Sequence, residues 1–239
     1  MSGMSRPHLK EILFAIAFGF FFSCSSTQPK TDAALTKEKA PMDIDLAKAI
    51  DQENIDQIKI LITNGADVNT ISERGDSTLS LGVFSKKPEL IAFALQKGAN
   101  VNALSKGGEP LGLVIAEFVA HNELPYETLV IASESGAELD GTLGRGATTP
   151  LHNAAKQCNL KVAQLLISRK VYLEPTDKFT NATPLHLAAQ KGCLPIVKLL
   201  IENGVDMNPR DENGRTPLDS AKSEKRWAVA KYLKSRGAI

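Results

Sequence analysis

The chain has 239 residues, of which 43% are hydrophobic and 5% aromatic, and 28 Lys and Arg stand against 27 Asp and Glu for a formal charge of +1. A chain of this length and apolar content can bury a core, which excludes disorder of the whole. The balanced charge supplies no basic footprint for nucleic acid. Its three cysteines are too few for a disulfide-built scaffold and too scattered for a zinc cluster.

The chain begins with a short apolar segment. Residues 12–22 read ILFAIAFGFFF and follow the basic residues Arg6 and Lys10. A helix over this segment rises about 16 Å, roughly half of a ~30 Å hydrocarbon core. The segment therefore fits the apolar region of a signal peptide, and residues 1–23 are expected to direct export.

A cysteine follows at the polar boundary of this segment. Residues 23–26 read SCSS, and a small residue followed by cysteine at this place resembles the lipobox of bacterial lipoproteins. The resemblance implies a lipid attached to Cys24 and a location in the bacterial cell envelope, facing the periplasm or in the outer membrane. Two alternatives stay open, cleavage after Ser25 by an ordinary signal peptidase and an uncleaved anchor, and both also export the remaining chain.

Residues 24–41 are expected to form a flexible tether that starts at the lipidated cysteine. From Ser25 they read SSTQPKTDAALTKEKAP, with almost no large apolar side chain. Such a stretch cannot bury enough surface to offset the entropy lost on ordering. The folded domain is therefore expected to start at Met42.

Two sequence landmarks recur through the rest of the chain with a period of about 33 residues. The first, Thr-Pro-Leu-His, begins at Thr149 and at Thr183 and returns as Thr-Pro-Leu-Asp at Thr216. The second, Gly-Ala-Asp-Val-Asn, begins at Gly65 and has variants that begin at Gly98, Gly136 and Gly204. Two independent markers that keep one period indicate a tandem repeat.

These landmarks resemble the signature of the ankyrin repeat family, in which T-P-L-H-x-A is followed by two short helices and G-A-D-V-N. The resemblance covers residues 42–239 and implies an all-α solenoid of about six helix-turn-helix units with projecting hairpin fingers. The units are expected at about 42–74, 75–107, 108–145, 146–179, 180–212 and 213–239.

Local sequence features also predict helices independently of the resemblance. The spacing i, i+3, i+4 of Ile196, Leu199 and Leu200 predicts a helix with one buried face. Asn54 and Asn159 stand at N-cap positions of second helices.

Two units depart from the regular pattern. In the third unit 25 residues separate the signature leucine from the landmark glycine, compared with 19 in the second and fifth units, so six extra residues are expected between its helices near residues 120–126. In the fourth unit Lys170 stands where the other second helices are followed by glycine. Strain or a different helix stop is expected there.

The signature residues are expected to be structural. In the ankyrin family the signature imidazole and threonine hydroxyl tie the turn to the neighbouring unit, and the resemblance assigns this role to Thr149, His152, Thr183, His186 and Thr216. The other histidines, His8 and His121, lie in the signal segment and in the insertion. No catalytic constellation follows from these positions, and no cofactor or metal ion is expected.

Cys158 and Cys193 fall at the helix turns of successive units. An oxidising compartment would permit a bridge between them. Neighbouring helices pack about 8–10 Å apart, whereas a disulfide needs Cα atoms within about 7 Å. Two free, half-buried thiols are therefore the favoured expectation, and the disulfide is the alternative.

Side chains on the fingers and at outward helix positions are expected to bind a partner. The signature Leu and Ala residues face neighbouring units, so the fingers and outward positions are the ones free to vary. Aromatic and arginine side chains are enriched among those that dominate interfaces. The candidates are Arg74, Arg145, Asn153, Lys178, Phe179, Gln190, Arg210 and Arg215. The insertion around Tyr126 is the competing site.

The sequence therefore predicts a non-catalytic protein-protein interaction module in the bacterial envelope, with a protein partner and a membrane contact through its lipid. An immunity-type protein that neutralises a toxin or hydrolase is the alternative for the same location. An enzyme or small-ligand carrier is disfavoured, because the sequence shows no convergent polar pocket. No nucleic acid partner is expected.

Overall fold

A computed structural model describes residues 32–239, which form twelve helices and no β-strand. The predicted signal peptide and Cys24 lie outside these residues. The helices are α1 (Asp32–Asp51), α2 (Ile55–Thr63), α3 (Thr78–Phe84), α4 (Pro88–Gln96), α5 (Leu111–Ala120), α6 (Tyr126–Glu134), α7 (Pro150–Lys156), α8 (Leu160–Ser168), α9 (Pro184–Lys191), α10 (Leu194–Glu202), α11 (Pro217–Ser223) and α12 (Trp227–Ser235). None of these helices has the length and hydropathy that a membrane span requires.

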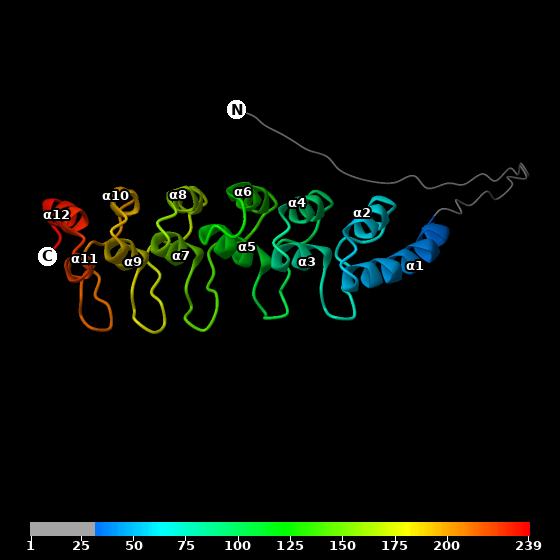
Figure 1. Cartoon of the computed structure of the whole chain (residues 1–239), viewed down its shortest axis with the longest axis horizontal. Coiled ribbons are helices and arrows are strands. Elements are labelled where there is room, and N and C mark those ends of the chain that lie inside the picture. The colour runs from blue at the N-terminus through cyan, green and yellow to red at the C-terminus, as the bar shows by residue number, and fades with distance from the viewer. Residues whose placement is uncertain (1–31) are drawn as a thin grey trace, which may run out of the picture.

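The helices form six pairs that stand in one row in chain order (Figure 1). Each predicted unit contains one pair, which confirms the all-α class and the solenoid arrangement. We call the odd-numbered helices the first helices and the even-numbered ones the second helices. The loops between pairs project from one side of the row, and we call them fingers 1 to 5, at residues 64–77, 97–110, 135–149, 169–183 and 203–216.

Small residues let the first helices stack closely. Helix α9 packs between α7 and α11, and its Ala188 and Ala189 are fully buried. The signature leucine that precedes them, Leu185, is 2% exposed. The buried apolar side chains form one cluster that extends from the first pair to the last. Each unit therefore contributes to a core that it could not build alone.

The Thr-Pro-Leu-His landmark starts the first helices. In α9 the Thr183 hydroxyl accepts a hydrogen bond from the His186 N–H at 3.4 Å, and His186 Nδ1 accepts one from the Thr183 N–H at 3.1 Å. Such a capping box satisfies backbone donors that a helix start otherwise leaves unpaired. The same arrangement recurs at α7, where Thr149 pairs with His152, and at α11, where Thr216 pairs with Asp219.

The Gly-Ala-Asp-Val-Asn landmark builds a hydrogen-bonded ladder along the stack. Its last side chain accepts from a backbone N–H of the following unit, as in Asn69 Oδ1 to Asn100 N at 2.8 Å. Equivalent bonds join Asn102 to Glu138, Asp140 to Tyr172, Glu174 to Asp206 and Asn208 to Ile239. Within the first unit, the Asp67 N–H donates to Asp43 of α1. The repeat period thus has a chemical reason, because each unit supplies one acceptor to the next.

The first unit corrects the predicted tether. Helix α1 begins at Asp32, so residues 32–41 are helical and do not belong to a flexible tether that ends at residue 41. This stretch is rich in Ala, Leu, Lys and Glu, which have high helix propensity even where little surface is buried. Pro41 lies inside α1 and lacks the N–H that would bond four residues back.

The six additional residues of the third unit lie partly within a helix. Helix α5 extends for ten residues from Leu111, whereas α3 extends for six from the equivalent Leu79. The connection to the second helix has five residues, 121–125, compared with three, 85–87, in the second unit. Four of the six residues therefore add about one helical turn, and only two lengthen the connection.

The second helices begin and end as predicted. The Asn54 side chain accepts from Gln57 N, and the Asn159 side chain accepts from Val162 N. Lys170 has a φ of 60°, so it ends α8 in the left-handed conformation that glycine adopts in the other units. This conformation costs a non-glycine residue about 1 kcal/mol or more, which is the strain expected at this position.

Cys158 and Cys193 form a disulfide, so the favoured expectation of two free, half-buried thiols is wrong. Their Cα atoms lie 5.5 Å apart, within the range that a disulfide requires. The separation of helix axes does not apply to this pair, because both residues lie in turns at helix ends. Cys158 is exposed and has a φ of 56°, whereas Cys193 is buried.

Removing this disulfide should lower stability. It closes a loop of 35 residues, and a loop of that size corresponds to about 3 to 4 kcal/mol in the chain-entropy model. We expect the double variant Cys158→Ser, Cys193→Ala to unfold at lower urea concentration than the oxidised wild type and at the same concentration as the reduced wild type. Alkylation of both cysteines in the unreduced, denatured protein, read by mass spectrometry, would contradict the bridge.

Candidate protein-binding surface

The signature histidines are bonded at both ring nitrogens. His152 is fully buried, its Nδ1 accepts from the Thr149 N–H at 3.2 Å, and its Nε2 therefore carries the proton that it donates to Ala182 O at 3.0 Å. His186 Nε2 bonds Arg215 O of the following unit at 3.0 Å. Burial lowers the pKa of both imidazoles. Both residues therefore join one unit to the next finger and present no free nitrogen at the surface.

Six of the candidate partner-binding residues are exposed on fingers: Arg74, Arg145, Lys178, Phe179, Arg210 and Arg215. Phe179 is 62% exposed, but its ring also lies against Gly146 of the preceding finger, where an added Cβ would be 3.3 Å from Cε2. The backbone N–H of Lys178 donates to Gly146 O at 2.9 Å. Phe179 thus combines a local packing role with an accessible apolar surface.

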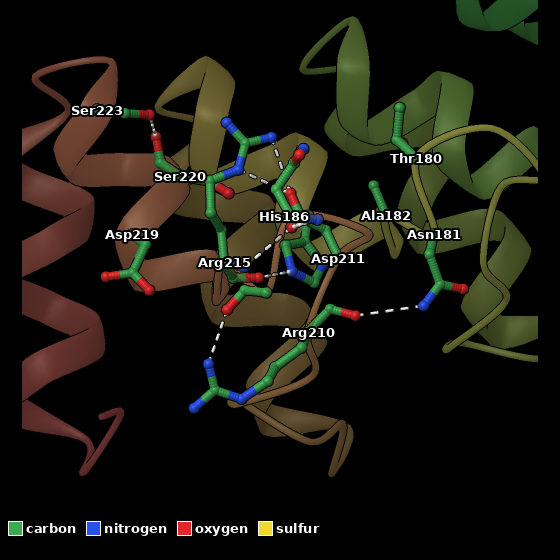
Figure 2. A network of polar contacts seen from close by, with 12 residues as sticks. Thr180, Asn181, Ala182, His186, Arg210, Asp211, Arg215, Asp219, Ser220 and Ser223 are labelled. Carbon is green, nitrogen blue, oxygen red and sulfur yellow. Dashed lines mark hydrogen bonds and ion pairs between the residues drawn. The ribbon is translucent and has the colours of Figure 1, made fainter.

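Arg210 and Arg215 are engaged within finger 5. Arg215 Nη2 lies 2.8 Å from Asp211 Oδ2, and Arg210 Nη1 donates to Gly214 O at 2.7 Å. Burial opposes ionisation of Asp211, but hydrogen bonds from Arg215 outweigh it and hold the pKa of that carboxyl below its ordinary value. Figure 2 shows this network together with the bond from Asn181 to Arg210 O. The two guanidinium groups therefore stabilise the conformation of finger 5 while remaining at the surface.

The two helix positions that were expected to point outward differ. Gln190 of α9 is exposed. Asn153 of α7 is only 7% exposed and its Nδ2 has no hydrogen-bond partner among the described residues, so the expectation that it points outward is wrong. The reason is its register, because the equivalent positions of α3 and α5, Leu81 and Leu113, are also buried.

A small cleft lies between α9, α11 and fingers 4 and 5. We call it the C-terminal inner cleft, and its volume is about 130 Å³. His186, Leu187 and Gln190 line it from α9, and Asp211 and Arg215 line it from finger 5. Asp211 bonds Arg215, and His186 bonds the Arg215 backbone oxygen, so these groups and the small volume leave little for a partner.

A larger cleft occupies the equivalent place three units earlier, and the sequence interpretation missed it. This N-terminal inner cleft, between α3 and fingers 1 and 2, has a volume of about 420 Å³. Its apolar wall is formed by Leu81 and Phe84, and its charged rim by Glu53, Asp76, Lys106 and Glu109. Phe84 is 48% exposed, and its ring packs edge-to-face on Phe118 with centroids 6.3 Å apart.

Repeat alignment supplies the signal that could have revealed this cleft. Phe84 lies five residues after the signature leucine Leu79, and Gln190 lies five residues after Leu185. The structure places both side chains in an inner cleft. A phenylalanine at a position that is polar in another unit is a candidate binding residue, since exposed aromatic side chains are enriched at interfaces.

Two further clefts lie away from the first-helix side. One of about 430 Å³ is lined by residues of fingers 3, 4 and 5 and includes the exposed Tyr172. Another of about 350 Å³ lies at the turn before α12 and includes Trp227, which is 64% exposed. Among the residues that the structure describes, no three His, Cys, Asp or Glu side chains gather as a metal site.

Comparison with known proteins identifies the repeat. A family model described as ankyrin repeats, in three copies, matches residues 119–211 and 151–239, which together make up half of the chain. A protein of Rickettsia bellii (strain RML369-C) that is named as an ankyrin repeat protein is 26% identical over 157 residues. The matched region is 54% of this chain and 22% of that protein, so the chain spans less than a quarter of its relative.

The buried histidines should make stability depend on pH. The pKa of each is lower in the folded protein than the roughly 6.5 of an unfolded imidazole. Their contribution is therefore complete above about pH 6.5 and is lost as the pH falls from there through the folded pKa. We expect a lower free energy of unfolding at about pH 5 than at about pH 7.5, measured by urea titration.

A double variant, His152→Gln with His186→Gln, provides the control. It should lose much of the difference between the two pH values, since glutamine does not titrate. The pKa of Asp177 and of Asp211 lies below 3.8, so these carboxylates lose their contribution only under more acidic conditions. A pH dependence that is unchanged in the variant would show that other groups cause it.

Proposed function

The chain belongs to the ankyrin repeat family, and on that premise we propose that it is a non-catalytic protein-binding module tethered in the bacterial cell envelope. The binding role rests on the contrast between buried, structural residues and exposed residues within each unit. Signature threonines and histidines are buried and bonded between units, whereas finger residues and first-helix residues such as Phe84 and Gln190 remain exposed. A surface of this kind recognises a partner by shape and side-chain pattern.

The envelope location rests on the first residues of the sequence. An apolar segment at 12–22 is followed by the small residue Ser23 and then by Cys24, as in bacterial lipoproteins. A disulfide between Cys158 and Cys193 fits an exported domain, because disulfides persist in oxidising compartments. Two or three acyl chains would anchor the protein firmly, at about 0.8 kcal/mol for each buried CH₂.

Substitution of Cys24 tests the anchor. We expect Cys24→Ala to move the protein from the membrane fraction to the soluble fraction or to leave it unprocessed, and to abolish labelling by a fatty acid. Ser26→Ala is the matched control and should behave as the wild type, since the acceptor thiol is intact. Membrane retention of the Cys24→Ala variant at the mature mass would contradict lipid attachment.

Partner capture tests the binding role and the finger assignment. A Phe179→Ala, Arg210→Ala variant with a normal thermal melt should bind the partner captured from detergent-solubilised envelope at least ten-fold more weakly, which is about 1.4 kcal/mol. Tyr172→Ala is the matched control, because it removes an aromatic side chain of similar exposure, 59%, that is not among the candidates. It should bind the partner as the wild type does. An affinity that survives the double variant but falls when residues 121–125 are shortened would place the site at the insertion.

A further inference from the structure

Charge is strongly segregated along the stack although the whole chain is nearly neutral. Residues 42–145 contain 16 Asp and Glu and 8 Lys and Arg, whereas residues 146–239 contain 8 Asp and Glu and 15 Lys and Arg. The formal charges of the two parts are therefore −8 and +7. Because the solenoid keeps the units in chain order, this sequence asymmetry becomes a spatial one, with an acidic N-terminal half and a basic C-terminal half.

The N-terminal inner cleft lies in the acidic half. Three carboxylates, Glu53, Asp76 and Glu109, line it together with one cation, Lys106. Lys106 Nζ is paired with Asp76 Oδ2 at 2.6 Å. After this pair is formed, the two glutamates give the cleft a net negative charge.

The two glutamates reach the cleft from different elements. Glu53 comes from the turn between α1 and α2 and is exposed, with a φ of 55°. Glu109 comes from finger 2, and its Oε1 accepts from Gly144 N of finger 3 at 2.9 Å, which fixes the carboxylate at the rim.

Besides these carboxylates, the cleft has an apolar and aromatic lining. Leu81 is 8% exposed, and Phe84 is 48% exposed and offers part of its ring. An aromatic face beside carboxylates suits a cation on an apolar stem, because the ring quadrupole attracts the charge within about 6 Å and the stem packs on the ring. The protein already uses this contact next to the cleft, where Lys86 Nζ lies 5.6 Å from the Phe118 ring centroid.

We propose that the N-terminal inner cleft receives an arginine or lysine side chain from a basic peptide segment of the protein partner, with the aliphatic stem against Phe84 and the charged head between Glu53 and Glu109. This inference rests on the proposed function, since it names the chemical class of that partner. A volume of about 420 Å³ accommodates one long side chain and the flanking peptide. The smaller and internally bonded C-terminal inner cleft does not offer an equivalent place.

A second copy of this chain is the rival occupant. Its last unit is basic and carries the exposed Trp227, so it could approach the acidic half of another molecule. Charge complementarity alone does not distinguish a basic peptide of a partner from a second copy as the occupant of the cleft. The size of the cleft favours a peptide, because about 420 Å³ takes one extended side chain with its flanking backbone, whereas the last unit would have to present a folded helix end.

Selection from a random peptide library displayed on phage tests the proposal. The probe is the library itself, applied to the immobilised full mature chain. We expect the enriched peptides to contain more Arg and Lys than Asp and Glu and to share a basic residue beside an apolar one. Affinity for a synthetic copy of the most enriched peptide should fall as the salt concentration rises, since charges are screened.

Variants locate the bound peptide. Phe84→Ala, and separately Glu53→Gln with Glu109→Gln, should weaken the peptide at least ten-fold, about 1.4 kcal/mol. The glutamine pair keeps side-chain shape and an acceptor for Gly144 N, so it tests charge if Phe84→Ala proves unstable. Tyr172→Ala, an exposed aromatic side chain outside this cleft, is the matched control and should bind as the wild type.

Several outcomes would overturn the proposal. The library could enrich acidic peptides or enrich none, or the cleft variants could bind the selected peptide as tightly as the wild type does. A salt-sensitive dimer, detected by sedimentation and displaced by the peptide, would identify a second copy as the occupant. The proposed function fails separately. If the envelope partner binds the wild type and Phe84→Ala equally, the proposed protein-binding function stands and the cleft assignment is wrong. If basic peptides bind the cleft but no envelope partner is captured, the cleft assignment stands and the proposed function in the envelope is wrong.

Discussion

One hydrogen bond from each unit to the next sets the spacing on which this molecule depends. A side-chain oxygen at the end of one landmark accepts from the backbone of the following unit, as Asn69 does from Asn100, and the bond recurs along the array. In the later units His152 and His186 add a second bond from a helix start to the next finger. Together they fix where each finger stands relative to its neighbours. The clefts between helices and fingers are therefore products of backbone spacing, and loop flexibility is not needed to form them.

The two halves of the stack differ in whether the polar groups at their inner clefts are bonded to one another. In finger 5 the charges of Asp211 and Arg215 satisfy each other, and the cleft beside them is small. In the N-terminal half, Phe84 leaves apolar surface exposed beside carboxylates, and the cleft is larger. The units that match the repeat signature best are thus internally satisfied, whereas a unit that departs from it retains unsatisfied surface. An additional recognition surface, besides the finger residues of the later units, is therefore expected where the sequence is less regular, since structural requirements already determine the regular positions.

Periodicity made the architecture predictable, because a repeated landmark must do the same job at every occurrence. The helix caps and the turn at Lys170 followed from local rules. The disulfide did not, since the distance between two turns depends on three-dimensional placement that helix spacing does not describe. Asn153 was expected to point outward because it lies outside the signature Leu and Ala positions, but its register also buries it. The N-terminal inner cleft was missed because total charge hides segregation along the chain, and Phe84 becomes conspicuous only when units are aligned.

The disulfide between the turns of the fourth and fifth units has a mechanical consequence. If the stack were pulled from its two ends, it would bear tension along its length, and solenoids yield unit by unit. The bridge closes 35 residues, which cannot be drawn out without breaking a covalent bond. At about 3.5 Å for each extended residue, the fully stretched chain is shorter by roughly 120 Å. The segment between the turns of the fourth and fifth units would therefore resist extension as one block, while the units on either side unfold first.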